Sequence, residues 1–551
     1  MPLRSIEMIK QESRHLRGRL YDDVFLNRDS GVSEESRQLL KFFGMYQQQD
    51  RDLKKKSGAG TPHTFMIRVA TAAGVLSSEQ YLALDGLCRD LAQAQLRLTS
   101  RQAVQIHGVV KGHLAPLVTR LIEMDMSSLA GCGDVVRNLA ACPLPDHGGA
   151  RDTVRAMALE LSQRLKPATQ AYLELFVAGE KVFDIVEEES LYGEQYLPRK
   201  FKIGMTIAGD NCVDIYSHDV GLVYHPSTDK WTILVGGGLA QSHGVAKTHA
   251  LLAQPLGQIP MHMLTQTVET IVRIQRDFGN RDDRRFARMK YLVEAWGLER
   301  FRMTVEERMG MLLDDPGKLQ WNHTTDHLVN EDPSVLGVRL PHGRIRDSHG
   351  MLWASALRDV VASCRPTLHI TAQQNLLLTG LNPESKAEAI RILTAYGVKS
   401  PTELSPFHRY ALACPALPTC TLALAESERV VDRVVDQIER WWTEAGLSPM
   451  DLRIRMTGCP NNCARPFLAE VGLVGAAPGR YHVYVGGSPQ GTRLARLAAE
   501  RIPIEDLGTT LLPLFRQYRE SRLNNDELFG DWCARNGIGQ APRASQNHEG
   551  G

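Results

Sequence analysis

Residues 64–110 alternate between apolar and polar positions first as in a strand, then as in a helix, then as in a strand again. The runs TFMIRVATAAGVL (64–76) and RLTSRQAVQIHGVV (97–110) have the short period of a half-buried strand. Between them, SSEQYLALDGLCRDLAQ (77–93) has apolar residues at helical spacing, a serine cap and a glutamate at the capping-box position. The segment therefore predicts a β–α–β unit.

The same order of elements returns in the second half of the chain. GVRLPHGRI (337–345), an apolar stretch (352–363) and LHITAQQNLLLTGL (368–381) repeat strand, helix and strand. Identical residues recur at a constant offset of 272: Thr99, Gln102, Gly108 and Cys142-Pro143 match Thr371, Gln374, Gly380 and Cys414-Pro415. A gap-free series of this kind indicates an old duplication.

Two further segments repeat at other offsets. LPRKFKI (197–203) resembles DLRIRMT (451–457), and LVGGGL (234–239) resembles YVGGSP (484–489). The second half carries four clustered cysteines, of which the first half keeps only Cys142. We therefore predict an α+β fold of two halves related by an approximate twofold axis, with one surviving metal site.

The composition indicates a globular protein without a general attraction to polyanions. Of 551 residues, 43% are hydrophobic and 23% are charged, and the formal net charge is +1. This balance gives no reason to expect binding to nucleic acid or to a membrane surface. No apolar run approaches the roughly 18 residues of a membrane helix, and the charged N-terminal stretch lacks the apolar segment of a secretory signal. We expect a cytoplasmic protein.

Four of the ten cysteines form two tight pairs. Five residues separate Cys414 from Cys420, and three separate Cys459 from Cys463. Thiolates are soft ligands that select zinc, copper(I) or iron–sulfur clusters. The wide first pair, and the proline after Cys414 and Cys459, favour a [4Fe–4S] cluster over a zinc knuckle, whose spacings are usually shorter. A zinc site and unrelated buried cysteines are the alternatives.

The segments around these cysteines, ACPALPTCTLALAESER and MTGCPNNCARPFLAEVGLVG, resemble the two signature blocks of the sulfite and nitrite reductase hemoprotein family. Other blocks resemble its assimilatory sulfite reductase branch in the same order: GMYQQQDRD, RLTSRQAVQIHG, LPRKFK, LVGGGL, QRDFGNRDDRR and APGRY. The resemblance covers roughly residues 5–540. It implies two ferredoxin-like half-domains and two larger reductase domains, with sirohaem and a [4Fe–4S] cluster as cofactors. All four cysteines would hold the cluster, and Cys463 would also bridge to the sirohaem iron.

The resemblance implies the six-electron reduction of sulfite to sulfide, in sulfate assimilation and cysteine biosynthesis. Such a site binds a small oxyanion and delivers protons as oxygens leave, which suits arginine and lysine. Lys200 and Lys202 are two apart in a strand-like run, so their side chains share one face. Arg68 and Arg137 match the family's anion-binding arginines. A solvated basic strand face is the alternative for the lysine pair.

Sirohaem carries eight carboxylates, so its pocket also needs cations and hydrogen-bond donors. The resemblance implies contacts from Arg101, Gln105, His107, Gly236, Gly237, Gly238 and Asn375. His107 is equally well interpreted as a core histidine, and the glycine triplet alone indicates only a turn.

The sequence departs from the family pattern at three positions. Asn462 replaces a glycine between the last two cysteines, and asparagine tolerates left-handed backbone. Ala70 replaces an arginine, and Gln373 stands where asparagine is usual. These changes affect the details of the sirohaem pocket.

Three other functions compete with this interpretation. An assimilatory nitrite reductase has the same fold and cofactors, but nitrite enzymes tend to carry asparagine where this chain has Lys202. A non-catalytic iron–sulfur carrier, or a zinc-stabilised binding protein, needs the cysteines but not the basic residues.

The electron donor is expected to be a separate protein. The chain has no G-x-G-x-x-G following a strand and no flavodoxin-like segment. A flavoprotein using NADPH, FAD and FMN is favoured over ferredoxin.

These interpretations predict the following domain limits: a helical arm (1–55), a first ferredoxin-like half-domain (60–132), a first reductase domain (133–325), a second half-domain (330–400), a second reductase domain with the cluster cysteines (401–540) and a disordered tail (541–551).

Overall fold

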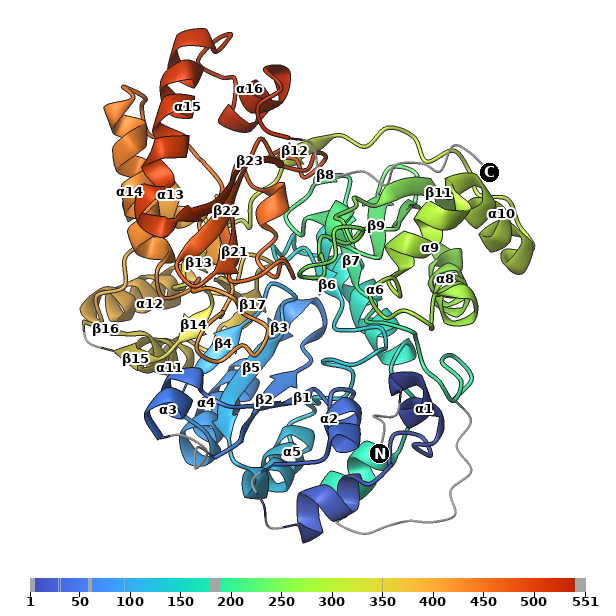
Figure 1. Cartoon of the computed structure of the whole chain (residues 1–551). Coiled ribbons are helices and arrows are strands. Elements are labelled where there is room, and N and C mark those ends of the chain that lie inside the picture. Colours follow the sequence, from blue (N-terminus) through green and yellow to red (C-terminus); the bar gives the residue numbers. More distant parts are fainter. Residues whose placement is uncertain are drawn as a thin grey trace.

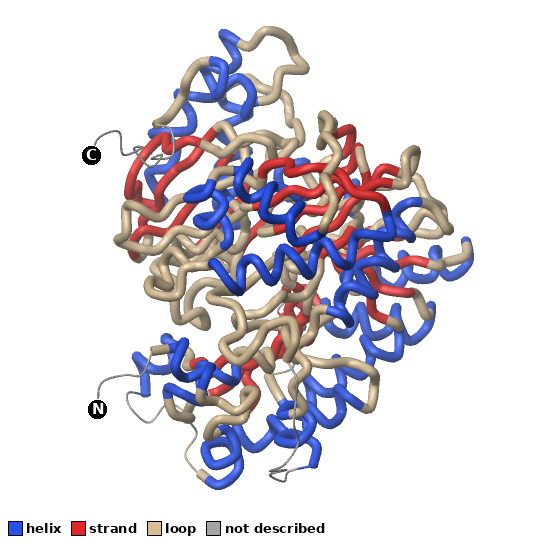
Figure 2. The backbone as a smooth tube through the Cα atoms, turned by 90° about the vertical axis from the view of Figure 1, so that its right-hand side faces the viewer, coloured by secondary structure: helices blue, strands red, loops and turns tan. Residues whose placement is uncertain are grey.

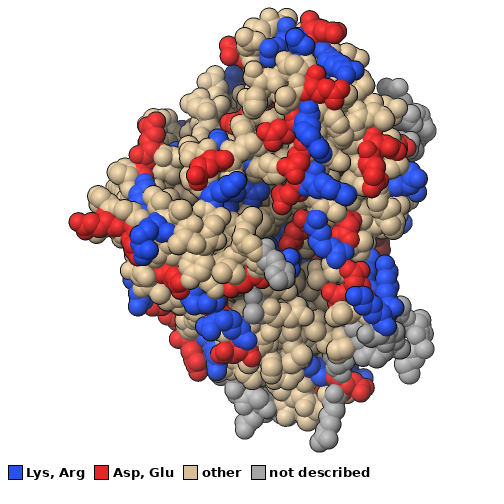
Figure 3. All heavy atoms as spheres, turned by 90° about the vertical axis from the view of Figure 1, so that its left-hand side faces the viewer, with Lys and Arg blue, Asp and Glu red and all other residues tan. Residues whose placement is uncertain are grey.

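The computed structural model describes residues 5–27, 29, 31–57, 62–93, 95–178, 189–348 and 350–540. The tail predicted at 541–551 lies outside these residues. None of the helices in the described ranges is long and apolar enough to cross a membrane. On the face drawn in Figure 3, acidic and basic side chains are interspersed, as the near-zero net charge leads one to expect.

The fold is α+β, as predicted, and four main sheets organise it (Figure 1). Two small sheets belong to the repeated β–α–β units. The first contains, in spatial order, β1 (Met45–Gln48), β2 (Thr64–Val69), β5 (Val104–Val109), β4 (Leu96–Leu98) and β14 (Arg344–Ile345). The second contains β13 (Leu336–Val338), β18 (Leu376–Thr379), β17 (Thr367–Ile370) and β3 (Val75–Leu76). The helices α4 (Ser78–Leu91) and α11 (Trp353–Cys364) complete the two units.

Each repeated unit lends a short strand to the sheet of the other. Strand β3 of the first unit pairs with β17 of the second, with Leu76 opposite Leu368. Strand β14 of the second unit pairs with β4 of the first, with Ile345 opposite Leu96. The receiving residues Leu96 and Leu368 are 272 residues apart, as in the sequence repeat, and the lent residues Leu76 and Ile345 are 269 apart, so the exchange follows the repeat to within three residues. The two halves therefore share backbone hydrogen bonds as well as side-chain contacts.

Two five-stranded sheets form the larger domains, and they have the same strand order and directions. One contains β6 (Ala140–Ala141), β7 (Ile203–Ile207), β9 (Val220–His225), β10 (Lys230–Val235) and β11 (Gln254–Pro260). The other contains β19 (Leu412–Ala413), β20 (Ile454–Thr457), β21 (Val471–Ala477), β22 (Arg480–Val485) and β23 (Arg496–Pro503). In both sheets, the first three strands run parallel to one another. The fourth strand is antiparallel to the third, and the fifth is antiparallel to the fourth. The predicted duplication therefore extends to these domains.

Helices and loops lie around the sheets (Figure 2). The larger domains carry corresponding helices, α6 (Ala150–Arg164) and α8 (Leu264–Phe278) in the first, α14 (Val431–Glu444) and α15 (Leu507–Ser521) in the second. The remaining α-helices of the described residues are α1 (Ile6–Gln11), α2 (Glu34–Leu40), α3 (Arg51–Ser57), α5 (Leu114–Ile122), α7 (Ala171–Leu173), α9 (Met289–Trp296), α10 (Leu298–Met309), α12 (Pro383–Ala395), α13 (Pro406–Arg409) and α16 (Phe529–Arg535).

The structure corrects several local predictions. The strand expected at 97–110 is two strands, β4 and β5, because a turn with left-handed Gln102 interrupts it. The capping box of α4 pairs Ser77 with Gln80, so the glutamate before Gln80 is not the capping partner. Strand β1, placed by the predicted limits in the helical arm, joins the first small sheet. The domain limits themselves stay a prediction.

The register of the larger sheets corrects the alignment of the second repeat. Ala140 pairs with Gly204, and its counterpart Leu412 pairs with Arg455, so Gly204 and Arg455 are equivalent. The alignment of LPRKFKI with DLRIRMT is therefore wrong by three residues. At the corrected offset of 251, Asn211-Cys212 corresponds to Asn462-Cys463. The inference that the first half keeps only Cys142 was therefore wrong, because Cys212 occupies the position of Cys463.

A pair of equivalent glutamines joins the two halves across the approximate twofold axis. Gln102 Nε2 donates to the carbonyl of Ile370 at 2.8 Å, and Gln374 Nε2 donates to that of Leu98 at 3.0 Å. Both glutamines have left-handed backbone, with φ of 55° and 69°, and both are buried. Leu98 and Ile370 are counterparts in the sequence repeat, so each glutamine donates to the residue equivalent to the other's acceptor. The two contacts are therefore related by symmetry, as in an isologous interface.

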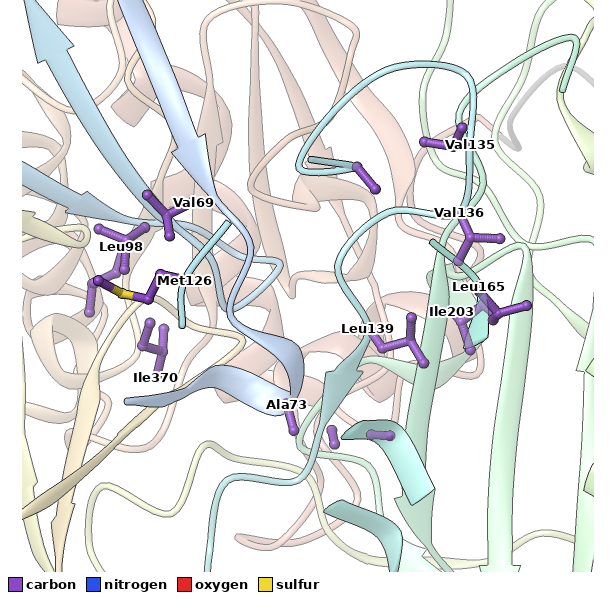
Figure 4. Packing of buried hydrophobic residues seen from close by; sticks show 14 of the residues in the cluster. Val69, Ala73, Leu98, Met126, Val135, Val136, Leu139, Leu165, Ile203 and Ile370 are labelled. Carbon is purple, nitrogen blue, oxygen red and sulfur yellow. The ribbon is translucent and has the colours of Figure 1, made fainter. Parts of the chain in front are cut away.

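One apolar core runs through both small units and the first larger domain, from Ile9 to Val398. Figure 4 shows part of it, where Val69, Leu98 and Ile370 group together and Leu139 lies near Ile203. The second larger domain has a separate core, from Phe407 to Cys533. The hydrogen-bonding groups between the two halves are therefore held by a packed apolar core on each side.

We expect Gln102→Ala to destabilise the protein by about 3 kcal/mol, since it leaves buried backbone groups unpaired. The Gln102 amide also donates to Ala141 O and accepts from Ala141 N, both at 2.7 Å. Gln374→Ala removes one such bond and should cost less. Urea unfolding midpoints measure the difference.

The exposed Gln517 on α15 provides the matched control, and Gln517→Ala should leave the midpoint unchanged. A Gln102→Ala midpoint equal to that of this control would contradict the role given to the glutamine pair.

Candidate active site

A cavity between the two halves is lined by positive charge and one thiol. Its charged and reactive side chains are Arg101, Lys202, His218, Arg288, Arg465 and Cys463. Arg101 follows β4, Lys202 precedes β7, and the cysteine lies in the loop between β20 and the short helix Pro466–Leu468. The structure thus brings together three of the residues singled out in the sequence, Arg101, Lys202 and Cys463.

A buried carboxylate fixes one wall of this cavity. Asp219 accepts from Arg288 Nη2 at 2.7 Å and Nε at 3.0 Å, and from the backbone N–H of Lys202 at 2.9 Å. Asp219 is fully buried and Arg288 nearly so. A fork-to-fork pair of this kind holds the guanidinium in one orientation. It leaves the Lys202 ammonium outside the pair.

Arg101 is held from three sides. It donates to His218 Nδ1 at 2.9 Å, to the carbonyl of Ile203 at 3.1 Å and to that of Asn138. His218 Nε2 in turn donates to Val213 O at 3.1 Å, so Nδ1 is free to accept. Burial first, and then neighbouring cations, lower the pKa of Arg101 to about 9 and that of His218 well below its usual value. His218 is therefore neutral and serves to orient Arg101.

Lys200 and Lys202 lie in an extended segment directly before β7. Buried Phe201 separates the two half-buried lysines, so their side chains share a face as predicted. Within the described ranges, neither Nζ has a hydrogen-bond or ion-pair partner. Burial, followed by Arg288 and Arg101, lowers the pKa of Lys202 to about 7, and burial and Lys202 lower that of Lys200 strongly. These ammonium groups are therefore placed to bind an anion or to give up a proton.

Arg68, Gln105 and His107 form a chain of contacts between β2 and β5. In the amide orientation that satisfies both partners, the Gln105 oxygen accepts from Arg68 Nη2 at 2.7 Å. The other amide atom lies 3.3 Å from His107 Nε2. Arg68 Nη1 also contacts Cys132 Sγ at 2.9 Å. Burial and nearby arginines hold the pKa of His107 well below its usual value, so it is neutral.

Arg137 adjoins this chain, since Cys132 and Tyr46 lie within electrostatic reach of it and Tyr46 is also within reach of Arg68. Its Nε and Nη2 donate to the carbonyl of Gly133 at 3.1 and 3.0 Å. Its positive charge helps to lower the pKa of both Arg101 and Lys200. Arg137 therefore belongs to the same positive field as the cavity residues, although it is not one of the side chains lining that cavity.

The four predicted cluster cysteines converge beside the cavity. Cys414 follows β19, and Cys459 and Cys463 lie in the loop after β20. Burial, and then repulsion by Cys463, raise the pKa of the Cys459 thiol to about 11 and also raise those of Cys414 and Cys420. Backbone and amide N–H groups point at the sulfurs, with Gly458 N 3.4 Å from Cys414 Sγ and Asn461 Nδ2 3.5 Å from Cys459 Sγ. A cationic group bound among the sulfurs would stabilise their thiolate form, which is the form that binds metal.

Cys463 differs from the other three cysteines in its exposure. It is exposed and lines the cavity, whereas Cys414 and Cys459 are buried and Cys420 is half-buried. The loop reaches this position through left-handed backbone at Asn462, with φ of 55°, which confirms that asparagine is tolerated there. Because the Cys463 thiol is near the other three cysteines and also lines the cavity, it is placed to bridge two groups.

The remaining residues proposed as sirohaem contacts, the three glycines and Asn375, pack against or hydrogen-bond to other parts of the protein. A Cβ at Gly237 would collide with the carbonyls of Tyr216 and His218, so a neighbouring loop already explains this glycine. Gly236 has φ of 87°, and Gly238 lies against Arg288. Asn375 donates to Asp326 at 2.6 Å and is not among the cavity-lining residues.

Four basic residues near the site were not predicted from the sequence. Arg288, His218 and Arg465 line the cavity, and Arg97 lies within electrostatic reach of Cys414 and Cys463. Arg288 ends the arginine-rich run RDDRRFAR, whose charge density was a usable signal. Arg97 and Arg465 stand in the quoted blocks RLTSRQAVQIHG and MTGCPNNCARPFLAEVGLVG without being singled out, and His218 carried no local signal.

These residues fit the two groups that the sequence implies. Arg101 Nε is buried without a hydrogen-bond partner, and the lysine ammonium groups are unpaired within the described ranges. Such an excess of cations suits a tetrapyrrole with many carboxylates and an oxyanion substrate. Four converging thiols, two of which (Cys414 and Cys420) pack with Leu412, Ala416 and Ala464, suit an iron–sulfur cluster.

Comparison with protein families identifies the class of the chain. The nitrite/sulfite reductase ferredoxin-like half domain matches twice, at residues 58–124 and 329–396. The nitrite and sulphite reductase 4Fe-4S domain matches residues 132–313, the larger domain without the four clustered cysteines. The chain belongs to the nitrite and sulfite reductase family, and the predicted pair of ferredoxin-like half-domains is confirmed.

Individual relatives match nearly end to end. The sulfite reductase (NADPH) hemoprotein beta-components of Staphylococcus haemolyticus and Myxococcus xanthus are 36% and 38% identical, over 97% and 98% of this chain and 95% and 98% of their own. The sulfite reductase (ferredoxin) of Synechococcus elongatus is 36% identical over 99% of this chain and 92% of its own. The Mycobacterium tuberculosis NirA structure covers 97% of both chains with a TM-score of 0.76 at 21% identity, which supports the fold.

We expect Lys202→Met to flatten the pH dependence of stability of the cofactor-free protein. Burial lowers the pKa of Lys202 from 10.5 to about 7, so between these pH values the unfolded state binds more protons than the folded state. Stability contributed by this group therefore rises with pH across that window. Urea midpoints between about pH 7 and 9 should rise less in the variant than in the wild type.

Lys318→Met is the control, because Lys318 is an exposed lysine outside the cavity. If Lys202→Met and Lys318→Met show the same pH dependence, Lys202 is not desolvated in the way described.

Proposed function

We propose that the chain reduces sulfite to sulfide with six electrons, at a sirohaem joined through the Cys463 thiolate to a [4Fe–4S] cluster. Cys414, Cys420, Cys459 and Cys463 would hold the cluster. The observation that carries this proposal is a single cavity where the accessible Cys463 thiol meets the unpaired Lys202 ammonium. Near full-length relatives named sulfite reductases support the same reaction.

The bound sirohaem and cluster would supply single electrons to the substrate. The protein's own residues must bind an oxyanion and provide protons, because the oxygens of sulfite leave as water. Lys200, Lys202, Arg68 and Arg137 contribute the positive field, with the arginines fixed by Gln105 and Gly133. A lysine with a pKa of about 7 holds its proton near neutral pH and also releases it readily, as a general acid must. Lys202 Nζ is therefore our candidate proton donor.

Charge also favours sulfite over nitrite. Sulfite carries two negative charges and nitrite one, so a second ammonium on one face stabilises sulfite more. Lys202→Asn should lower kcat/KM for sulfite at least about tenfold more than for nitrite, which corresponds to about 1.4 kcal/mol of transition-state binding. Turnover with a chemical electron donor, with sulfide, ammonia and electrons counted, measures both ratios and tests the six-electron stoichiometry.

Lys318→Asn provides the control for a lost surface charge and should leave both activities unchanged. Equal losses on both substrates in Lys202→Asn would remove Lys202 as the discriminating residue. Wild-type protein that reduces nitrite but yields no sulfide would make the chain a nitrite reductase. Cofactor-loaded protein inactive on both substrates would favour an electron carrier.

We further propose that electrons come from an NADPH-dependent flavoprotein carrying FAD and FMN, in the cytoplasm. Two of the relatives described above are named as NADPH enzymes and one as a ferredoxin enzyme. Comparing sulfide formation with a diflavin reductase and with reduced ferredoxin decides between the donors, and cell fractionation tests the location.

A further inference from the structure

A second cluster of metal-binding side chains lies in the first larger domain, away from the four clustered cysteines. One ligand atom from each of Cys142, Asp210, Cys212 and His327 lies within 4.8 Å of all the others. All four side chains are buried, with exposures of 0%, 1%, 0% and 4%. None of them has a part in the proposed reduction of sulfite. We propose that these four residues form a tetrahedral zinc site.

The distances within the cluster are close to those of a zinc tetrahedron. Cys142 Sγ lies 3.6 Å from His327 Nε2 and 3.3 Å from Asp210 Oδ2, and these two atoms are 2.8 Å apart. Bonds of about 2.3 Å to sulfur and about 2.0–2.2 Å to nitrogen and oxygen place such ligand atoms about 3.4–3.6 Å apart. The His327–Asp210 pair would open by about half an ångström around the ion, replacing their hydrogen bond.

Surrounding contacts hold the ligands in place. Asp210 Oδ1 accepts from the backbone N–H of Cys212 at 3.0 Å, and Arg151 contacts Oδ2 at 3.3 Å. The His327 ring stacks on His323, with centroids 3.9 Å apart and planes within 10°. Partners that orient the ligands in this way are characteristic of metal sites.

His327 also has an unfavourable backbone. Its φ is 61°, in the left-handed region, in a buried residue other than glycine or asparagine. Such a conformation costs on the order of 1–3 kcal/mol and persists where the surroundings require it. Here it aims the ring into the cluster, beside the short parallel pairing of β12 (Trp321–His323) with β8 (Gly209–Asp210).

The twofold relation between the halves gives an independent reason to expect a metal here. Cys142 corresponds to Cys414 by the repeat, and Cys212 corresponds to Cys463 by the strand register. The cluster therefore occupies the counterpart of the four-cysteine site. Gly148 stands in the place of Cys420 by the repeat, and Ala208 in the place of Cys459 by the strand register, so two thiols are lost.

The donor set has changed to one that suits a different metal. Asp210 and His327 supply the third and fourth donors, giving two sulfurs, one nitrogen and one oxygen. An iron–sulfur cube prefers four thiolates, whereas zinc accepts mixed cysteine, histidine and carboxylate ligands. A closed, four-ligand site of this kind is structural, and it would fasten the segment around His327 to the first larger domain.

Zinc content and zinc X-ray absorption of the full-length protein with its cofactors test the proposal. We expect about one zinc per chain, bound by two sulfurs at about 2.3 Å and two lighter atoms at about 2.0–2.2 Å. These measurements are element-selective, so the iron groups do not interfere. Absence of zinc, a four-sulfur shell, or a Cys142–Cys212 disulfide in peptide mass spectra would overturn the proposal.

Variants separate this site from the four-cysteine pocket. Cys212→Ser and His327→Asn should lower zinc at least tenfold while the iron content stays unchanged. Cys88→Ser alters another buried cysteine outside the cluster and should retain zinc. Zinc that persists in both cluster variants would overturn the assignment, and the wild-type spectrum decides the question if those variants do not fold. A zinc-free protein with full sulfite turnover would refute this site and leave the proposed function intact.

Discussion

The concentration of positive charge between the two halves is the constraint that shapes the rest of the molecule. Arg101, Lys202, Arg288 and Arg465 converge on one cavity, and few buried carboxylates are there to balance them. Asp219 holds Arg288 at 2.7 Å, and Asp214 holds Arg465 at 2.7 Å. Cations removed from water without enough partners are costly unless an anion joins them. This unfavourable burial of cations occurs at the place where the protein would bind an anionic cofactor and an anionic substrate.

The duplicated frame explains how such a cavity is built. Each small unit lends a strand to the other's sheet, and Gln102 and Gln374 make reciprocal contacts across the axis. The paired residues Asp214 and Arg465 occupy equivalent positions in the two larger domains and share left-handed backbone, yet one is an acid and the other a base. Symmetry thus supplied two similar surfaces, and substitution made them complementary.

The sequence predicted the architecture well because the duplication left identities at a constant offset. It also predicted which cysteines converge, since their spacing and flanking prolines are local features. It misplaced the second repeat by three residues, because LPRKFKI and DLRIRMT look alike in composition while the strand register follows the buried positions. That error hid the equivalence of Cys212 and Cys463. His218 and His327 were beyond sequence reasoning, since only the folded chain brings their loops together.

The central claim is that the Cys463 thiol joins an iron–sulfur cluster to a sirohaem in this cavity. It is tested most directly by the absorption spectrum and iron content of protein purified from a host able to make sirohaem. We expect a Soret band with red-region sirohaem bands, and about five irons per chain, one more than a [4Fe–4S] cluster supplies. A colourless protein, or a cluster without haem in a properly supplied preparation, would contradict it.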